Sequence, residues 1–408
     1  MSDPWQPYLW IVGVLWLAAM AQAALSLWDG ITFHRFMKKA LQQRLDAVYQ
    51  PPATVILPCC GVDDELRQTV DMLGAQRYRD YDVIFTFESQ ADPAYEAVGA
   101  WAAKWSGVRW KRVMAGPAEG RSQKVHNLLA AVAAVDEGRE VLAFIDSDAI
   151  PHPDWLAWLV APLRDPHVGA GTGFRWYRAA GGWTSGLRSA WNAASVSFLH
   201  NPAVNFCWGG STAIRTKTFR DCGVAERWRT ALSDDYQLTR AVRDAGLELR
   251  FVPQCLISCE EQMGFAQFVA FARRQLVITR ICNPRLWREA LALATLLVFG
   301  ASGTFVLMIV AALAQRWTLA AVTCAAWLLL LSTARAKALV RQSAVSMFLQ
   351  PPKWTNRDWA HDVLGVEVVG VVHLFLLLST AVTRRVRWRD RDYVLLSADK
   401  TLVLPRNK

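Results

Sequence analysis

Two short acidic clusters are the residues best suited to chemistry in this sequence. The first, Asp146-Ser147-Asp148, directly follows the apolar run Val141–Ile145. Carboxylate oxygens are the ligands that hard divalent ions prefer, and such ions share their coordination with substrate phosphates. A solvated turn is the alternative, because Asp and Ser also favour turns. The position at the end of a buried-strand pattern favours a metal site, with Asp146 and Asp148 as ligands of Mg²⁺ or Mn²⁺.

The second cluster, Asp234-Asp235, precedes a segment with helical apolar spacing. An acidic or hydroxyl residue at a helix start ordinarily caps the helix, which contributes about 1 kcal/mol. Ser233 or Asp234 can fill that role, so Asp235 is left available as a general base. Transfer from a metal-held diphosphate to a hydroxyl needs only one such base, because the metal already compensates the leaving group.

An alternation of strand and helix patterns surrounds both clusters between residues 52 and 260. Ala53–Pro58 and Val141–Ile145 are continuous apolar runs, which is typical of buried parallel strands. This alternation predicts a doubly wound, Rossmann-like α/β sheet, whose ligands lie at the carboxyl ends of the strands. The other expected elements are a strand at Val83–Phe87 and helices at Asp63–Leu73, Asp92–Trp105 and Asp154–Leu163.

The N-terminal segment Pro7–Trp28 is apolar and almost uncharged. A hydrocarbon core of ~30 Å takes about 20 helical residues to cross, so this segment is expected to span a membrane. It lacks the small-residue cleavage site of a secretory signal and is therefore interpreted as an anchor. The positive-inside rule places the following domain in the cytoplasm, as in a bacterial inner-membrane protein. The basic residues that follow the anchor are His34, Arg35, Lys38, Lys39 and Arg44.

The C-terminal third predicts further membrane helices. Phe265–Ile281 has the mixed basic and apolar character of an interfacial helix. The expected spans are Leu291–Leu313, Leu319–Ser332 and Val363–Val382, with Arg335–Asp362 along the interface. Three spans would place the basic cluster Arg384–Arg391 outside, against the positive-inside rule, so one segment is re-entrant or Leu291–Leu313 is a broken hairpin. The resulting domains are residues 1–50, 51–263, 264–290 and 291–408.

Composition agrees with a membrane protein. Hydrophobic residues make up 53% of the 408 residues, the mean hydropathy is +0.14, and there are 20 Trp. The net charge of +10 lies beside apolar segments, which favours anionic lipid headgroups over nucleic acid as the partner. The eight cysteines are scattered without the second pair that a zinc site needs, so free thiols are expected.

Five motifs in order resemble a known family. ILPCCGVDDEL, FESQADPA, FIDSDAIPHPDWL, WGGSTAIR and SDDYQL together resemble inverting family 2-type glycosyltransferases, and most closely the ceramide glucosyltransferase group. The resemblance covers residues 5 to 300 and implies a GT-A fold, a UDP-sugar donor and a membrane lipid acceptor. Ceramide or another sphingoid lipid is the first expectation, and a hopanoid polyol or diacylglycerol the next.

The resemblance also assigns residues to the donor. By position, Pro58, Glu88 and Asp92 would line the uracil and ribose pocket, and Asp146 would bind donor and metal together with Asp148. Lys124 and Asn127 match the family's Lys-x-x-Asn stretch, where the lysine would approach the donor. An isolated surface lysine is the alternative for Lys124.

Acceptor-side residues follow from the same resemblance. Trp208, Gly209 and Gly210 match the acceptor loop, where glycine permits close approach of the backbone to a ligand. A core position is the alternative for Trp208. His200 lies near a family histidine, and Asp234 would border the acceptor beside the base Asp235.

One stretch departs from the family pattern. The interfacial helix normally carries an Arg/Gln-x-x-Arg-Trp motif, and here the corresponding residues are Arg274-Gln275-Leu276-Val277-Ile278. The first arginine remains, whereas the Arg-Trp pair has become Val-Ile. We expect Arg273, Arg274 or Arg280 to meet the donor diphosphate instead.

Two other functions remain open from the sequence. A processive polysaccharide synthase would need more spans and an intact Arg-Trp pair. A catalytically lapsed lipid-binding protein would explain the missing pair but not the full set of carboxylates. Within the last predicted span, Glu367 and His373 would line a headgroup slot or make hydrogen bonds inside the helix bundle. For the arginines around Trp388, lipid-surface anchoring is expected.

Overall fold

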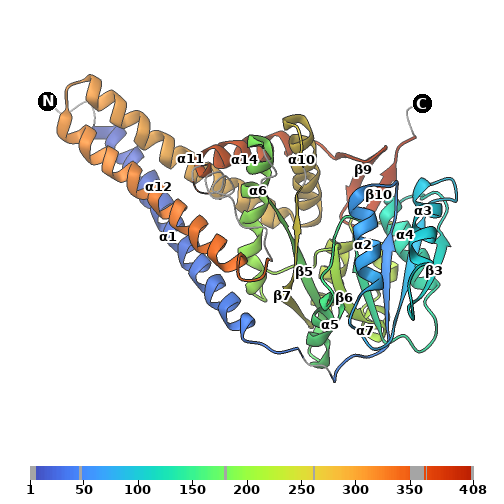
Figure 1. The fold of residues 1–408 in the computed structure, drawn as a ribbon. Helices are drawn as coiled ribbons and strands as arrows, with labels where there is room; N and C mark the ends of the chain where they lie inside the picture. The colour runs from blue at the N-terminus through green and yellow to red at the C-terminus, as the bar shows by residue number, and fades with distance from the viewer. Residues whose placement is uncertain are drawn as a thin grey trace. The chain divides into compact units, whose positions relative to one another are not determined.

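The alternating segments form a seven-stranded sheet in the order β3-β2-β1-β4-β6-β5-β7 (Figure 1). Parallel pairing joins β3, β2, β1 and β4, and also β5 with β7, whereas β6 is antiparallel to β4 and β5. This largely parallel sheet confirms the predicted α/β class. The strands are β1 Ala53–Pro58, β2 Tyr81–Phe87, β3 Arg109–Met114, β4 Val141–Ile145, β5 Val168–Tyr177, β6 Ser211–Arg215 and β7 Glu248–Cys259.

Helices cover both faces of this sheet. Val55 and Leu57 of β1 pack into a core with α2, α3 and α5, whereas Ile56 packs into a second core with α4, α7, α8 and α9. Successive strand side chains point to opposite faces, so an uninterrupted apolar run such as β1 requires both faces to be covered. The helices are α2 Asp64–Gly74, α3 Pro93–Ala102, α4 Gln123–Ala133, α5 Trp155–Val160, α7 Thr216–Asp221, α8 Val224–Trp228 and α9 Asp234–Asp244.

The computed structural model describes residues 6–45, 48–178, 182–260, 262–349, 363 and 365–405. Two compact units divide the chain. The sheet unit contains the described parts of residues 39–177, 198–260 and 384–408, and the helical unit those of residues 1–38, 178–197 and 261–383. Residues 182–197 thus belong to the helical unit and residues 384–405 to the sheet unit.

A small antiparallel sheet, in the order β10-β9-β8, completes the sheet unit. Its strands are β8 Arg385–Trp388, β9 Arg391–Ser397 and β10 Lys400–Val403. The basic C-terminal segment is therefore folded structure. Its packing against the large sheet's loops is described with the site below.

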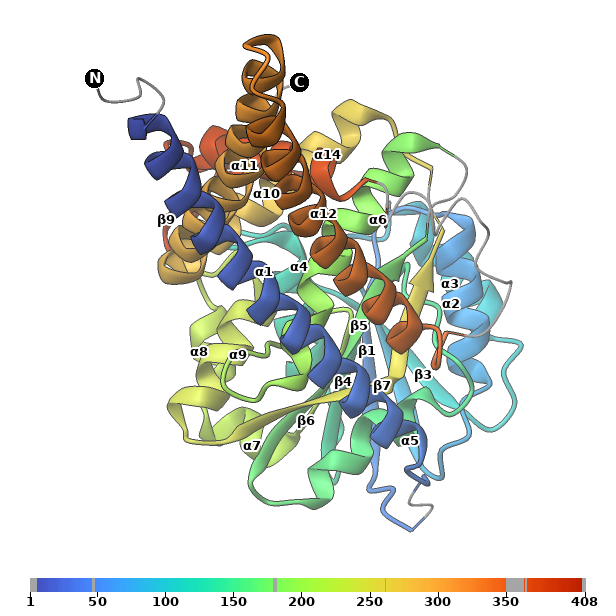
Figure 2. The same ribbon diagram turned by 90° about the vertical axis from the view of Figure 1, so that its left-hand side faces the viewer.

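Long helices form the other unit, with α1, α11 and α12 lying alongside one another (Figures 1 and 2). Trp16 Nε1 of α1 donates to the carbonyl of Ala326 in α12 at 2.9 Å. A Cβ on Gly300 of α11 would lie 2.8 Å from Ala19 Cβ, so glycine allows α1 and α11 to approach closely. The helices are α1 Gln6–Leu41, α6 Trp183–Val196, α10 Phe265–Cys282, α11 Pro284–Leu313, α12 Trp317–Val345 and α14 Val366–Thr380.

Three of these helices, α1, α11 and α12, are long and apolar enough to cross a membrane. The prediction of a span at Val363–Val382 is wrong, because α14 has 15 residues and rises only about 22 Å. The broken-hairpin alternative is also wrong, since Leu291–Leu313 lies within one continuous helix. Residues 335–345 of the predicted interfacial segment continue α12, and residues 350–362 lie outside the described part of the chain.

Polar residues of α14 make hydrogen bonds within the helical unit. Trp191 Nε1 donates to His373 Nδ1 at 2.9 Å, and Arg335 is 3.0 Å from Glu367 Oε1. These contacts support the helix-bundle interpretation of both residues. All eight cysteines are free, as predicted.

Candidate active site

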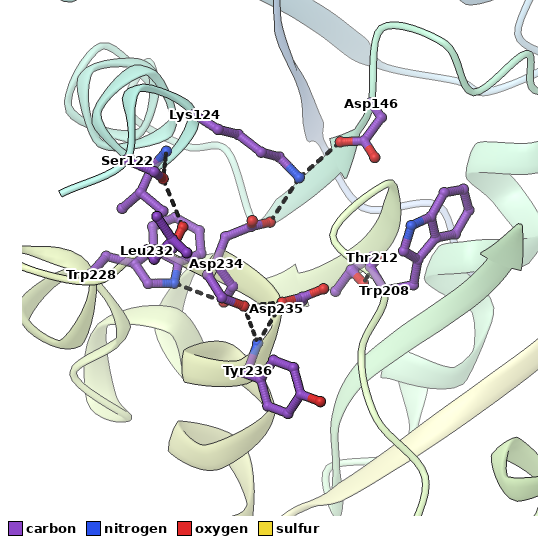
Figure 3. Close-up of polar contacts among 12 residues, drawn as sticks. Ser122, Lys124, Asp146, Trp208, Thr212, Trp228, Leu232, Asp234, Asp235 and Tyr236 are labelled. Carbon is purple, nitrogen blue, oxygen red and sulfur yellow. Dashed lines mark hydrogen bonds and ion pairs between the residues drawn. The ribbon is translucent and has the colours of Figure 1, made fainter. Parts of the chain in front are cut away.

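Lys124 lies between two carboxylates that are far apart in the sequence (Figure 3). Its Nζ is 2.8 Å from Asp146 Oδ1 and 3.2 Å from Asp234 Oδ2. Lys124 is in the first turn of α4, Asp146 follows β4, and Asp234 begins α9. Burial by itself would lower the pKa of Lys124, but Asp146 and Asp234 outweigh burial and raise it. The lysine therefore stays charged and joins three elements at the carboxyl edge of the sheet.

Local caps fix the ends of α4 and α9 around this lysine. Ser122 Oγ accepts the N–H of Val125 at 3.2 Å and donates to the Leu232 carbonyl at 2.7 Å. The first turn of α4 is thereby attached to the loop before α9. Ser233 is the cap of α9, and its Oγ accepts the N–H of Tyr236 at 3.2 Å. Of the two caps considered from the sequence, the structure has Ser233.

Asp234 and Asp235 have different surroundings. The Asp234 side chain is only 7% exposed and points toward Lys124 (Figure 3), and burial raises its pKa to about 6. Asp235 is half-buried, and its Oδ1 accepts the N–H of Tyr236 at 2.8 Å and the hydroxyl of Ser233. Asp234 is thus committed to the lysine, whereas Asp235 is oriented by two neighbouring donors.

Arg175 holds the Asp146-Ser147-Asp148 cluster from β5. Its Nη1 is 2.5 Å from Asp148 Oδ2 and its Nη2 is 2.6 Å from Asp148 Oδ1, which makes a bidentate pair. The same Nη2 is 3.4 Å from Asp146 Oδ2. Burial by itself would raise the pKa of Asp148, but Arg175 outweighs burial and lowers it to about 2. Both carboxylates of the motif are therefore paired with cationic side chains.

The Trp208-Gly209-Gly210 loop presses against these carboxylates. A Cβ on Gly209 would clash with Asp234 Oδ2 and lie 2.9 Å from Lys124 Nζ. A Cβ on Gly210 would clash with the Trp208 ring and lie 2.6 Å from Asp146 Oδ2. The two glycines are thus required by packing at the site.

The Trp208 ring is half-buried, with the Arg175 guanidinium 5.1 Å from its centroid. Trp208 therefore lies beside Arg175, the residue that pairs with Asp148.

The residues predicted to bind the nucleotide lie at the ends of β1 and β2. Pro58 ends β1 and Glu88 follows β2. Asp92 caps α3, and its Oδ1 accepts the N–H groups of Ala94 and Gly61, both at 2.9 Å. Asn127 is buried, and its Oδ1 accepts from Gln123 Nε2 at 2.8 Å. Asp92 therefore holds the loop after β1, whereas Asn127 is bonded within α4, and contact of either residue with a donor stays a prediction.

The β8–β10 sheet reaches the same edge from the end of the chain. Arg391 Nη2 is 2.5 Å from Glu88 Oε1, and both side chains are largely buried. Arg389 donates to the carbonyl of Cys60, and Gln237 Nε2 of α9 donates to the carbonyl of Ala398 at 2.5 Å. The small sheet thus contacts β1, β2 and α9 around the carboxylates.

Three predicted site residues are not among these contacts of the sheet unit. Arg274 and Arg280 lie on α10 of the helical unit, where Arg280 Nη2 donates to the Thr383 carbonyl at 2.6 Å. His200 ends the short 3-10 helix Ser197–His200. Val277 and Ile278, which replace the Arg-Trp pair, are buried in the packing of the helical unit. Participation of the two arginines and His200 stays a prediction.

Comparison with known proteins decides the family. Residues 11–401 match the sequence model of Glycosyl transferase family 21. The chain belongs to this family. It is therefore a glycosyltransferase, and the predicted GT-A architecture with membrane helices agrees with the sheet and helices described above.

Among individual relatives of this glycosyltransferase, Ceramide glucosyltransferase 1 of Caenorhabditis elegans is 25% identical over 203 residues. The match covers 48% of this chain and 43% of that protein, so the chain spans less than half the length of that relative.

Solved structures with a related arrangement include a mannosyltransferase of Pyrobaculum calidifontis in complex with GDP-Man and Mn²⁺. It is 19% identical, covers 88% of this chain and 99% of its own, and has a TM-score of 0.49. Glucosyl-3-phosphoglycerate synthase of Mycobacterium tuberculosis with Mn²⁺ and UDP-Glc is 17% identical and has a TM-score of 0.37. The match covers 60% of this chain and 82% of that protein's chain.

Sequence reasoning missed Arg175, Arg389 and Arg391 as members of the glycosyltransferase's site. One signal for Arg175 was available, because it is the charged residue in the apolar run Phe174–Tyr177, and a charge in a buried strand requires a partner. The arginines of β8–β10 carried no such signal. A basic segment beside apolar helices is equally typical of a lipid-facing surface and of a folded part of the site.

The carboxylates of the site fit a divalent metal that shares its coordination with a donor. Asp146 and Asp148 are oxygen ligands of the kind that Mg²⁺ and Mn²⁺ share with substrate phosphates. Among the described residues, no group of three or more His, Cys, Asp or Glu could hold a metal by itself. Asp146 and Asp148 would supply two ligands, and a diphosphate would supply others.

Proposed function

We propose that this glycosyltransferase transfers a hexose from a UDP-sugar to the hydroxyl of a membrane lipid, with inversion and with a divalent metal. The observation that carries the proposal is the pair of cations that join the two acidic clusters at the carboxyl edge of the sheet. Lys124 contacts Asp146 and Asp234, next to Asp235, and Arg175 contacts Asp146 and Asp148. Ligands of open α/β sheets bind at this edge. Ceramide or another sphingoid lipid is the proposed acceptor class, supported by the name of the nematode relative and by three candidate spans.

Each side chain has a defined part in this proposal. Asp235 accepts the proton of the acceptor hydroxyl while the hydroxyl oxygen attacks the sugar. Hydrogen bonds from Ser233 and Tyr236 hold the Asp235 carboxylate in place. Asp146 and Asp148 would hold the metal, which compensates the charge of the leaving diphosphate. Lys124 keeps its charge beside Asp146 and adds a fixed positive charge where the phosphates would lie.

The test is expression in a bacterial host that makes no glycolipid, with sphingoid lipid supplied, followed by mass spectrometry of extracted lipids. A sphingolipid that gains the mass of one hexose supports the proposal. The Asp146→Asn/Asp148→Asn double variant should lose this product. A hexosylated diacylglycerol or hopanoid would overturn the sphingoid acceptor, and a long polymer would favour a processive synthase. Donor binding without any product would favour a lapsed enzyme.

Purified protein tests the metal. UDP release in the presence of acceptor should stop when the divalent metal is chelated and return when Mg²⁺ or Mn²⁺ is added. Release that continues unchanged in chelator would contradict the metal assignment and leave the family-level transferase activity intact.

A further inference from the structure

The bidentate pair between Arg175 and Asp148 supports an inference that rests on the proposed use of a metal and a nucleotide-sugar. We propose that Arg175 is a donor-binding residue that neutralises the metal-binding carboxylates in the donor-free enzyme. It releases Asp148 when the divalent cation binds, and it then contacts the donor diphosphate.

The geometry sets Arg175 in competition with a metal ion. Both oxygens of Asp148 are within 2.6 Å of the guanidinium, and Asp146 Oδ2 is 3.4 Å from Nη2. A cation bound to Asp148 at a ligand distance of about 2.0–2.6 Å would lie only a few ångströms from this guanidinium. Two positive charges at that separation repel strongly in a partly buried site. Arg175 and the metal cation therefore do not bind Asp148 at the same time.

Charge balance explains why Arg175 would remain near the site. Four carboxylates, Asp146, Asp148, Asp234 and Asp235, lie around Lys124 and Arg175, and the charge of Arg389 also acts on Asp148. A divalent ion would offset the excess of negative charge that remains. The donor's diphosphate then brings new negative charge, and a guanidinium released from Asp148 is well suited to meet it because its planar fork binds phosphate in bidentate fashion.

The two cations differ in their freedom to move. Lys124 is held by Asp146 and by Asp234, of which the latter is deeply buried. Asp148, by contrast, is 43% exposed, so the Arg175 pair borders solvent on the side of Asp148. The Trp208 and Tyr177 rings lie 5.1 and 5.9 Å from the Arg175 guanidinium, and cation–π contact with them offers a surface along which it can shift. Arg175 is therefore the cation that exchanges, and Lys124 the one that stays.

Mn²⁺ binding measured by electron paramagnetic resonance tests the competition without turnover or acceptor. In the absence of nucleotide, Arg175→Gln should bind Mn²⁺ at least about tenfold more tightly than the wild type, which corresponds to about 1.4 kcal/mol. Arg175→Lys keeps the charge but loses the bidentate geometry and should lie between the two. If Arg175→Gln fails to fold, Arg175→Lys carries the same comparison.

Two further variants separate direct competition from a general change in charge. Lys124→Gln also removes one positive charge but leaves Asp148 paired, so its Mn²⁺ affinity should rise less than that of Arg175→Gln. Arg139→Gln removes another buried arginine, whose Nη1 lies 2.8 Å from Asp80 and whose Nε lies 3.2 Å from Asp82. It should leave Mn²⁺ affinity unchanged and serves as the matched control for stability.

The second half of the proposal is tested with nucleotides. At saturating Mn²⁺, Arg175→Gln should bind UDP at least about tenfold more weakly than the wild type and bind uridine equally well, because uridine has no phosphates. Equal loss for UDP and uridine would overturn the diphosphate contact.

Unchanged or weaker Mn²⁺ binding in folded Arg175→Gln would overturn the competition, as would Mn²⁺ binding to neither protein without UDP. Failure of the proposed function has a different signature. The wild type would then form no glycolipid even though the Mn²⁺ and UDP measurements follow the pattern above.

Discussion

Two carboxylates of the site, Asp234 and Asp148, each have a cationic neighbour. Asp234 faces Lys124, and Arg175 faces Asp148. Asp235 differs, because its Oδ1 accepts from a hydroxyl and a backbone N–H. Asp235 is thus held by neutral donors, and it is the residue that we propose as the base.

Replacement of Asp235 by Asn keeps the side-chain shape and removes the base. We expect kcat to fall by about 10²- to 10⁴-fold, the usual contribution of a general base, while UDP affinity changes little. UDP release with a lipid acceptor gives kcat, and calorimetry gives the affinity.

The matched control is Asp244→Asn at the other end of α9, where Asp244 is exposed and lies 2.9 Å from Arg227. It should keep wild-type kcat. Normal turnover in Asp235→Asn would remove Asp235 as the base.

Gly209→Ala tests the tight packing of the Trp208-Gly209-Gly210 loop. The new methyl group would collide with Asp234 Oδ2 and crowd Lys124, so we expect lower stability by about 1–3 kcal/mol and a strong loss of activity. Thermal unfolding and UDP release measure the two effects. Gly182→Ala, where a Cβ would meet no atom within 4 Å, should be nearly neutral, and equal effects at both positions would contradict the packing account.

At the scale of elements, the β8–β10 sheet gives two arginines of the basic C-terminal segment a structural role. Arg389 and Arg391 are used in contacts with Cys60 and Glu88 of the sheet unit. Tyr393 adds a further contact, since its hydroxyl accepts the N–H of Gln123 at 3.4 Å. Lipid anchoring therefore stays a prediction for the other arginines of the segment. Through these contacts the last strands of the chain hold the loops that the donor is predicted to meet.

Arg391→Gln should weaken UDP binding several-fold. Glu88 would lose its ion pair with Arg391 at the end of β2, and loss of one partner of a largely buried pair is costly. Calorimetry with UDP and Mn²⁺ gives the affinity, and thermal unfolding shows any accompanying loss of stability.

Arg387→Gln is the matched control, since Arg387 is exposed on β8 of the same sheet and the change in charge is equal. It should keep UDP affinity. Equal weakening in both variants would point to net charge rather than to the Glu88 contact.

At the scale of the whole molecule, the composition of the sheet unit bears on the membrane topology. The described parts of residues 39–177, 198–260 and 384–405 belong to this unit, and we expect them to share one side of a membrane. The chain between residues 260 and 384 would then cross an even number of times, and the candidate spans α11 and α12 would supply two crossings. The C-terminal arginines would lie on the same side as His34, Arg35, Lys38 and Lys39. This arrangement would satisfy the positive-inside rule, and we expect that side to be the cytoplasm.

Reporter fusions in a bacterial host test this topology. Green fluorescent protein fused after Lys408 should fluoresce, and alkaline phosphatase at the same position should be inactive, because both report the cytoplasm. A fusion after Ala314, between α11 and α12, should give the opposite pattern. An active phosphatase after Lys408 would require a third crossing in the C-terminal part and would contradict the assignment.

The sequence by itself determined the class of the sheet, the two acidic clusters and the N-terminal span. Each of these depends on a local pattern. The apolar runs of β1 and β4 require cover on both faces, and the carboxylates at strand and helix ends follow from position alone. The apolar length of α1 likewise needs no partner to be recognised.

Tertiary structure alone decided which charges meet. Arg175 lies 27 residues from Asp148, and Arg391 is more than 300 residues from Glu88. No local spacing reports such pairs, because strand order and the return of the C-terminal sheet bring them together. The length of α14 also depended on the fold, since hydropathy does not mark where a helix ends. The acidic motif was therefore visible in the sequence, whereas its cationic partners became visible only in three dimensions.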